Sequence, residues 1–490
     1  MSLSNQSKNL HLLSRAGFGI AAKDSSFINS HSQKKLLGEI SINTPPAFLD
    51  KASQESKDIA KELLAMKGME KTMMNEQGDT KRDIRRDFRR QSNEDIRQLS
   101  LAWIDLMVND KAQLREKIAL FWHGHFACRD NNIFYTQQLL HIIRSNALGN
   151  FGDMLKAVSK SAAMLGFLNN QQNRKQHPNE NFAREVMELF TLGRGNYTEQ
   201  DIKEAARAFT GWNFEKNGDF VVKKNVHDDG EKTIFGKTGN FNGDDVLNML
   251  LENKQTARYI VTKLYKYFVN DTEIDHNKIE MLANNFYKSN YDIASLMKTI
   301  FLSDWFYDPK NIGCKIKSPV ELIVNIRRLL PMQLEKPDIQ LVFTKGLGQE
   351  LFSPPNVAGW PGGKNWIDSS SLMIRLVIPR LIQDDTEFQL SVKADDDTMM
   401  GNYMKEMRKN MLNNNRYKIK AKIDWTTVNT VFENTKRENL MNDIQLYLVN
   451  KQNNTNTQKV VESIVDNTSR EAYIKSGTIG WMSTPEFQMT

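Results

Sequence analysis

The chain contains very little cysteine: only Cys128 and Cys314 occur among its 490 residues, and neither belongs to a CxxC pair. Two isolated thiols exclude a disulfide framework or a zinc ribbon, and they suit a reducing compartment. Long apolar runs are also missing, so no membrane-spanning helix is expected. The polar start, Met1 to Gln6, leads into no apolar signal-peptide core. We therefore expect a cytoplasmic protein; an envelope location would require an export signal ahead of this sequence.

The standard catalytic motifs are missing as well. The sequence has no GxSxG elbow, Walker loop, HExxH helix or Rossmann fingerprint. Gly346 and Gly348 lack the third glycine and the preceding strand of a dinucleotide site. Nucleotide-dependent chemistry is therefore not expected. Basic residues exceed acidic ones by only 7 charges over 490 residues, a thin excess that does not indicate nucleic-acid binding.

What the sequence does contain is helical periodicity. Apolar residues recur at i, i+3 and i+4 in many segments, among them 98–108, 114–122, 133–144, 199–209, 256–268 and 319–330. Thr198 and Asp201 form the pattern of a capping box. Short β-rich runs between glycines interrupt the helices around 213–243. We therefore expect a mainly α fold, a large single multi-helix domain with a small β-hairpin or irregular insertion around 213–243.

Composition divides the chain into three parts. We expect residues 1–390 to form the helical core domain and the acidic, Asn-rich 391–420 to be a polar linker. Residues 421–490 should form a helical segment that packs back on the core. The basic, highly charged helix 78–97 should be peripheral. It could bind a phosphate or an acidic partner, but such runs are more often solvated helices with i,i+4 ion pairs, which we favour.

The segment 178–193 is the strongest candidate for chemistry. Asn179 can cap it and Gly193 can end it in the left-handed conformation. On a helix, its polar residues share one face, opposite an apolar face; these polar residues are Asn181, Arg184, Glu185 and Glu188. The face is either a solvated charge stripe or a buried polar stripe that binds a metal or substrate. Spacing alone favours the solvated stripe.

Histidines supply further candidates. His123 and His125 flank Gly124, and they can share a metal only if the preceding helix ends there; one of them could instead pack in the core. His227 precedes Asp228 in a glycine-rich loop, where it could bind a metal or act as a base, or simply belong to a turn capped by aspartate.

Two further segments could shape a binding site. His11 and Arg15 share a helix face before a glycine turn, where an anion pocket is conceivable. The loop 345–368 is rich in proline, glycine and tryptophan, and it should be ordered but irregular. It carries Asn356, Trp360 and Trp366.

Several ordered strings together carry a family resemblance. They are HLLSRAGFG at 11–19, FWHGHF at 121–126, ALGNF at 147–151, the 178–193 segment, AFTGW at 208–212, HDDGEKT at 227–233, KSPVE at 317–321, LGQ at 347–349 and PPNVAGWPGG at 354–363. The chain resembles the bacterial family catalogued as domain of unknown function 1800, over about residues 8–380 and again near 483–488.

The resemblance implies a mainly helical protein of unestablished biochemical role. Its motif-matching histidines and carboxylates are His11, His123, His125, Glu180, Glu185, Glu188 and His227. It implies a possible partner from domain of unknown function 1501, a family that looks like sulfatases and phosphatases. The family more often has a longer polar side chain where Gly124 stands. Because the polar strings are the family's signature, the resemblance favours a shared polar site.

Two hypotheses follow. In the first, the protein is a metal-assisted hydrolase of an anionic or carbohydrate-like substrate. Its catalytic residues would be His123, His125, Glu185, Glu188 and His227. The ligands of one divalent metal ion would be His123, His125, Glu185, His227 and Asp228. The substrate would contact His11, Arg15, Asn181, Arg184, Asn356, Trp360 and Trp366. In the second, the protein is a non-enzymatic binding or scaffold protein, and its polar cluster is a structural network.

Overall fold

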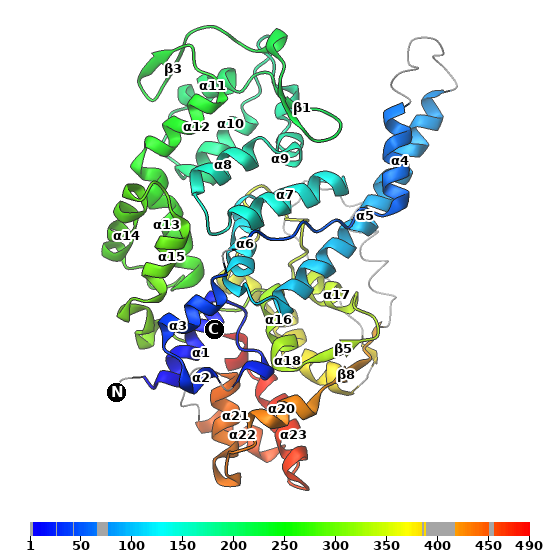
Figure 1. Ribbon diagram of the computed structural model, residues 1–490, viewed down its shortest axis with the longest axis vertical. Helices are drawn as coiled ribbons and strands as arrows, with labels where there is room; N and C mark the ends of the chain where they lie inside the picture. The colour runs from blue at the N-terminus through cyan, green and yellow to red at the C-terminus, as the bar shows by residue number, and fades with distance from the viewer. Residues whose placement is uncertain are drawn as a thin grey trace.

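A computed structural model describes residues 3–25, 27–42, 44–65, 77–384, 387–388, 417–449 and 455–490, and it confirms the mainly α fold. The longest helix, α5 (Gln77–Asn109), crosses the middle of the elongated molecule (Figure 1). The other helices of the first half are α1 (Asn5–Ala16), α2 (Phe27–Ser30), α3 (Gln33–Ile40), α4 (Gln54–Ala65), α6 (Gln113–His125), α7 (Ile133–Asn146), α8 (Phe151–Ser159), α9 (Ala162–Phe167), α10 (Asn181–Glu185) and α11 (Glu199–Ala208).

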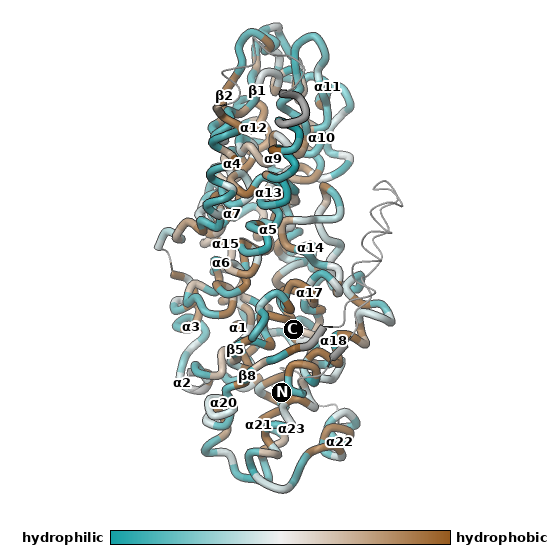
Figure 2. The backbone as a smooth tube through the Cα atoms, turned by 90° about the vertical axis from the view of Figure 1, so that its right-hand side faces the viewer, coloured by the Kyte–Doolittle hydropathy of each residue, from teal (hydrophilic) through white to brown (hydrophobic). Residues whose placement is uncertain are grey.

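The second half continues the pattern of short helices. They are α12 (Gly243–Glu252), α13 (Lys254–Phe268), α14 (His276–Lys288), α15 (Ile293–Phe301), α16 (Pro319–Leu329), α17 (Ile339–Gly346), α18 (Ser369–Asp384), α20 (Trp425–Val431), α21 (Leu440–Leu448), α22 (Thr455–Ser463) and α23 (Arg470–Met482). Apolar and polar residues alternate along them (Figure 2), because each helix buries one face and exposes the other. The capping box of Thr198 and Asp201 is confirmed at the start of α11.

Strands occur only as two-stranded antiparallel pairs in the part of the chain that is described. The insertion around 213–243 holds two of these pairs, as expected: β1 (Trp212–Phe214) with β2 (Phe220–Val222), and β3 (Lys232–Ile234) with β4 (Lys237–Gly239). Two pairs were not expected. They join β5 (Met332–Leu334) to β8 (Ala421–Ile423) and β6 (Glu387–Phe388) to β7 (Tyr417–Lys418). Most of the expected 391–420 linker lies outside the described residues.

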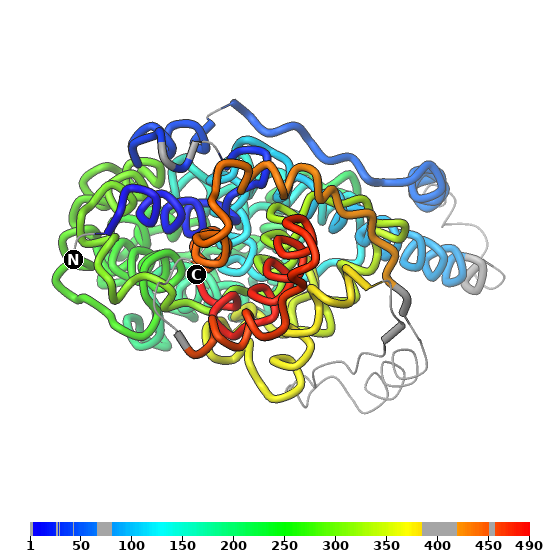
Figure 3. Tube along the Cα trace, turned by 90° about the horizontal axis from the view of Figure 1, so that it is seen from below, coloured from blue at the N-terminus to red at the C-terminus, as the bar shows by residue number. Residues whose placement is uncertain are grey.

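Two apolar clusters form the core. The larger one runs from α1 through α5 to α8 and on to α12–α15, and it includes Trp103 and Trp122. The second unites α16–α18 with the C-terminal helices α20, α21 and α23, around Leu322 and Trp481. Helix α1 contributes to both, with Leu12 in the first cluster and Leu10 in the second. The N-terminal segment and the C-terminal helices consequently lie in the lower part of the molecule in Figure 1, and the C-terminal helices face the viewer when it is seen from below (Figure 3).

The basic stretch of α5 is a charged surface. Arg86 and Arg90 are exposed, and they form i,i+3 ion pairs with Asp83 and Asp87 at 3.2 and 3.8 Å. This is the solvated-helix interpretation that the sequence favoured. No helix among the described residues is both long enough and apolar enough to span a bilayer.

Candidate functional site

A cleft of about 470 Å³ lies where α6 and α13 approach the start of α16. The loop 358–366 closes its remaining side. A volume of this size accommodates a small-molecule ligand. Its polar and aromatic lining comprises Phe121, His125, Lys263, Lys266, Tyr267, Asp271, Thr272, Lys315, Ser318, Glu321, Gln349, Trp360, Lys364 and Trp366.

The lining of the cleft is rich in positive charge. Lys263, Lys266, Lys315 and Lys364 contribute four ammonium groups, against two carboxylates. One carboxylate is already engaged, because Asp271 forms a 3.0 Å ion pair with Lys315. The excess of cations gives the cleft a positive potential, and such a potential attracts an anion.

Glu321, the second carboxylate, is engaged at the floor of the cleft. It forms an ion pair with the buried Lys117, accepts a 2.7 Å hydrogen bond from the Ser318 amide and receives the Tyr267 hydroxyl at 3.4 Å. Burial by itself would raise the pKa of the Glu321 carboxyl. Lys117, the Ser318 amide and Lys315 outweigh it and lower that pKa to about 2. The carboxylate is therefore ionised at neutral pH.

More cations lie behind this floor. The buried Lys317 donates to Asn325 Oδ1 at 2.8 Å and to the Phe487 carbonyl at 2.6 Å, and burial lowers its pKa to about 7. Arg15 is buried as well; it donates to the Asn311 carbonyl at 2.7 Å and to Cys314 Sγ at 3.2 Å. Arg15 therefore contributes charge from beneath the cleft but does not line it.

The loop 358–366, which carries Trp360 and Trp366 and is called the tryptophan loop below, packs closely against the backbone of α6. Gly359 has φ +84°, and a Cβ atom there would lie 2.3 Å from the Gly124 carbonyl oxygen. Only glycine fits this position without a shift of the backbone. The approach places the half-buried Trp360 and the buried Trp366 on the wall of the cleft. The exposed Asn356 faces its own loop, where its side chain accepts a 2.9 Å hydrogen bond from the Ala358 amide.

His125 presents a bare nitrogen in the wall of the cleft. Its Nε2 lies 3.2 Å from the Phe190 carbonyl oxygen, and because a carbonyl only accepts, this nitrogen carries the proton. The Nδ1 atom is buried and has no hydrogen-bond partner in the described part of the chain. Burial, with the charge of Lys263, lowers the pKa of His125 well below its ordinary value. The ring is therefore neutral, and its Nδ1 is an unpartnered acceptor that is shielded from solvent.

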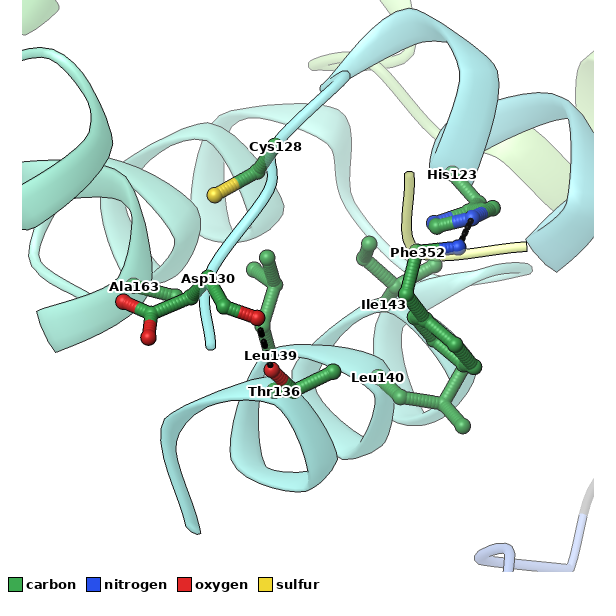
Figure 4. A pocket seen from close by; sticks show the side chains of 9 residues that line it. All are labelled: His123, Cys128, Asp130, Thr136, Leu139, Leu140, Ile143, Ala163 and Phe352. Carbon is green, nitrogen blue, oxygen red and sulfur yellow. Dashed lines mark hydrogen bonds between the residues drawn. The ribbon is translucent and has the colours of Figure 1, made fainter. Parts of the chain in front are cut away.

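His123 faces away from this cleft into the core. Its Nε2 accepts a 3.1 Å hydrogen bond from the Phe352 amide, and burial lowers its pKa to about 3. It borders an internal cavity of about 10 Å³, beside Cys128 and Asp130 (Figure 4). A cavity of that size holds about one water molecule and no larger ligand.

The polar residues of the 178–193 segment do not reach the cleft. The segment changes from α10 to a π-helical turn, η4 (Val186–Thr191), so its expected single polar face is interrupted. Arg184 forms surface ion pairs with Glu180 at 3.3 Å and Glu199 at 2.6 Å. Asn181 donates to the Leu168 carbonyl at 3.1 Å.

The two carboxylates of that segment lie beside each other rather than beside the histidines. Glu188 accepts a hydrogen bond from the Tyr197 hydroxyl. Burial, and then the charge of Glu188, raise the pKa of Glu185. Gly193 ends the segment with φ +80°, as expected.

His227 and Asp228 stabilise the insertion. His227 Nδ1 donates to the Thr210 carbonyl at 2.7 Å. Asp228 forms an ion pair with Arg207 at 2.8 Å and accepts the Gly230 amide at 2.8 Å. Of the interpretations that the sequence left open, this loop is therefore the turn capped by aspartate. His11 is likewise a core residue, and its ring lies 4.6 Å from that of Phe306.

The expected metal site is not assembled. No group of three or more histidine, cysteine, aspartate or glutamate side chains among the described residues is placed to hold a metal ion. Four of the five expected ligands are instead engaged by carbonyls, amides and ion pairs of their own surroundings; they are His123, His125, His227 and Asp228. The fifth, Glu185, lies near the like charge of Glu188. Of the expected site residues, the cleft gathers His125, Trp360 and Trp366.

Sequence reasoning missed the cationic part of the cleft. Lys263, Lys266, Lys315 and Lys364 carry no motif, because single lysines normally mark a surface. Ser318 and Glu321 did carry one. The pattern Ser-Pro-x-Glu is a capping box with proline at the first helical position, and the structure confirms it at α16.

Comparison with known proteins gives one match. The model of a family described as "Protein of unknown function (DUF1800)" matches residues 11–489, nearly the whole chain and further than the motifs indicated. No curated protein and no solved structure matches it. The match includes the tryptophan loop, the start of α16 and the residues that line the cleft. The chain therefore belongs to the DUF1800 family of proteins of unknown function.

Proposed function

We propose that the protein binds an anionic, carbohydrate-like ligand in the cleft between α6, α13 and the tryptophan loop. The observation that carries this proposal is the combination of four lysines with two tryptophans around one cavity of about 470 Å³. Lysines attract and hold a carboxylate, phosphate or sulfate group. An indole face packs against the apolar face of a sugar ring.

Hydrolysis of such a ligand would depend on acid–base groups of the cleft itself. Support for the metal-assisted form is lacking, because the expected ligands do not form a donor set in the described part of the chain. Glu321, held ionised by Lys117, can stabilise positive charge, but its low pKa makes it a weak base and it cannot donate a proton at neutral pH. Neutral His125 lines the cleft, and its buried Nδ1 would accept a hydrogen bond from a ligand hydroxyl only after the ring rotates.

Binding is the first test. We would measure tryptophan fluorescence and thermal shift with glucuronate and glucose 6-phosphate, and compare neutral glucose and inorganic phosphate. We expect the anionic sugars to bind more tightly than either control, because the cleft joins a cationic lining to an aromatic wall. Equal responses to glucose and glucose 6-phosphate would remove the anionic part of the proposal.

Variants locate the binding. The double variant Lys266→Met/Lys364→Met removes two exposed charges of the cleft. It should weaken anionic-sugar binding about tenfold, or about 1.4 kcal/mol. Lys298→Met, an exposed lysine on α15 outside the cleft lining, is the matched control. Unchanged affinity in the double variant would place the ligand elsewhere.

The scaffold interpretation remains the alternative, and one observation favours it. Glu321, Lys117 and the capping box of α16 form a buried network that would fix helix packing with or without a ligand.

A phosphatase- or sulfatase-like partner, which the family resemblance implies, would handle substrates of the same charge. Co-purification of the two proteins, with and without an anionic sugar, would test that association.

A further inference from the structure

We propose that Lys263 is a nucleophile of the cleft and forms an imine with a carbonyl group of the anionic ligand. The inference rests on the proposed function, because it takes the same cleft as the binding site. It narrows the ligand class to anionic aldehydes and ketones, including the open-chain forms of sugar acids and sugar phosphates.

The surroundings of Lys263 differ from those of Lys117 and Lys315. Lys117 and Lys315 each form an ion pair with a carboxylate, Glu321 and Asp271 respectively. Lys263 forms no ion pair with a carboxylate in the described ranges; its Nζ lies 5.3 Å from the centre of the Tyr259 ring. The side chain is half-buried on α13 and lines the cleft. Its amine is therefore available to a ligand.

The environment keeps part of this amine uncharged. Burial, and then the charge of Lys266 one turn away, lower the pKa of Lys263 to about 8. At about pH 7.5 roughly a quarter of such an amine is neutral, against about one in a thousand for an ordinary lysine. Desolvation beside another cation is the known way to activate a lysine nucleophile.

His125 provides an independent indication of a ligand at this place. Its buried Nδ1 is an unpartnered acceptor in the same wall, and the charge of Lys263 acts on the ring. A rotation of the ring would let this nitrogen accept a hydrogen bond from the attacking amine or from a ligand hydroxyl. We assign it a positioning role, since its lowered pKa makes it a weak base.

The proposed step is balanced without any further reactant. The Lys263 lone pair forms a bond to the carbonyl carbon, and a proton passes from nitrogen to the former carbonyl oxygen. The second amine proton then joins that oxygen, which departs as water and leaves a carbon–nitrogen double bond. No electrons are gained or lost. Lys266, Lys315 and Lys364 would hold the anionic group, and Trp360 would pack on the ring or chain of the ligand.

The test uses pyridoxal 5′-phosphate, an anionic aromatic aldehyde, on the full-length protein. Borohydride reduction converts an imine to a stable amine, and peptide mass spectrometry identifies the labelled lysine. We expect Lys263 to be labelled at least about tenfold faster than the exposed lysines, because much more of it is neutral. Lys317, whose pKa is lowered further, is buried behind the floor of the cleft, where the probe does not reach it. Lys263→Met and Lys263→Arg should both lose this label. Lys266→Met should keep it at a lower rate, because the variant weakens binding and removes a charge that lowers the pKa of Lys263.

A matched probe separates the two proposals. Pyridoxine 5′-phosphate carries an alcohol in place of the aldehyde, so it can bind but cannot form an imine. If it binds the cleft while the aldehyde labels lysines evenly or elsewhere, the imine is refuted and the binding site stands. If neither probe binds and no lysine is preferred, both proposals are refuted. Selective labelling of Lys263 that pyridoxine 5′-phosphate suppresses supports both.

Discussion

Removal of the charge on Glu321 tests the network under the cleft most directly. Glu321→Gln keeps the size of the side chain and an acceptor oxygen for the Ser318 amide, but it leaves Lys117 without its counter-ion. A pKa that falls from 4.5 to about 2 corresponds to about 3 kcal/mol of preference for the charged carboxyl. We therefore expect the variant to lose about 3 kcal/mol of unfolding free energy at neutral pH.

The pH dependence follows from the direction of the shift. The folded pKa of Glu321 lies below its ordinary value, so its stabilisation is fully present above about pH 4.5 and is lost as the pH falls towards about 2. The stability difference between the parent and Glu321→Gln should therefore shrink over that range. Urea unfolding followed by tryptophan fluorescence measures it, since Trp103, Trp122 and Trp481 are fully buried.

A double-mutant cycle provides the control. Lys117→Met/Glu321→Gln removes both charges, so it should cost less than the sum of the two single variants, with a coupling of about 2–3 kcal/mol. Additive losses, or a loss below about 1 kcal/mol in Glu321→Gln, would refute the idea that this pair stabilises the floor of the cleft.

Three further predictions concern the loop, the cleft and the metal. Gly359→Ala should displace the tryptophan loop, lower the unfolding free energy by about 1–3 kcal/mol and abolish ligand binding. Gly362→Ala is the control: its added Cβ meets no atom within 4 Å, so it should fold normally in thermal-shift assays. A normal Gly359→Ala protein would contradict the close approach. Gly124→Gln should fold as well as the parent, because its Cβ also meets no atom within 4 Å. The new side chain would project from the cleft lining, so the variant should bind anionic sugars more weakly. Unchanged affinity would count against the cleft as the binding site. Elemental analysis should find less than one equivalent of metal in the purified protein, and His123→Ala should leave that content unchanged; one equivalent lost in the variant would restore the metal hypothesis.

The local features of the fold were predictable, because local sequence determines them. Helical periodicity, the capping box at Thr198 and the glycine stop at Gly193 each depend on a few adjacent residues. The pairing of β5 with β8 could not be predicted, since it joins residues almost ninety positions apart. Strands of three residues carry too little pattern to identify a distant partner.

The site was predicted only in part, for a related reason. His125, Trp360 and Trp366 stood out as unusual residue types in unusual strings, and they line the cleft. The lysines did not stand out, because only their proximity in space, across α13 and two loops, brings them together. Glu185 and Glu188 stood out by spacing, but the π-helical turn and the local partner Tyr197 keep them outside the cleft. A spacing argument cannot detect either effect.

The segment beneath the cleft has a consequence for biosynthesis. Its backbone pairs with residues 488–490, and Lys317 donates to the carbonyl of Phe487, 170 positions later in the chain. At a translation rate of about 5–20 residues per second, those partners emerge roughly 10 to 30 s after Lys317 does. During that interval a lysine destined for burial has no acceptor at Phe487. The proposed binding site would therefore form completely only after residues 487–490 have left the ribosome. Nascent chains halted before residue 487 should lack ligand binding even where helices earlier in the chain have folded.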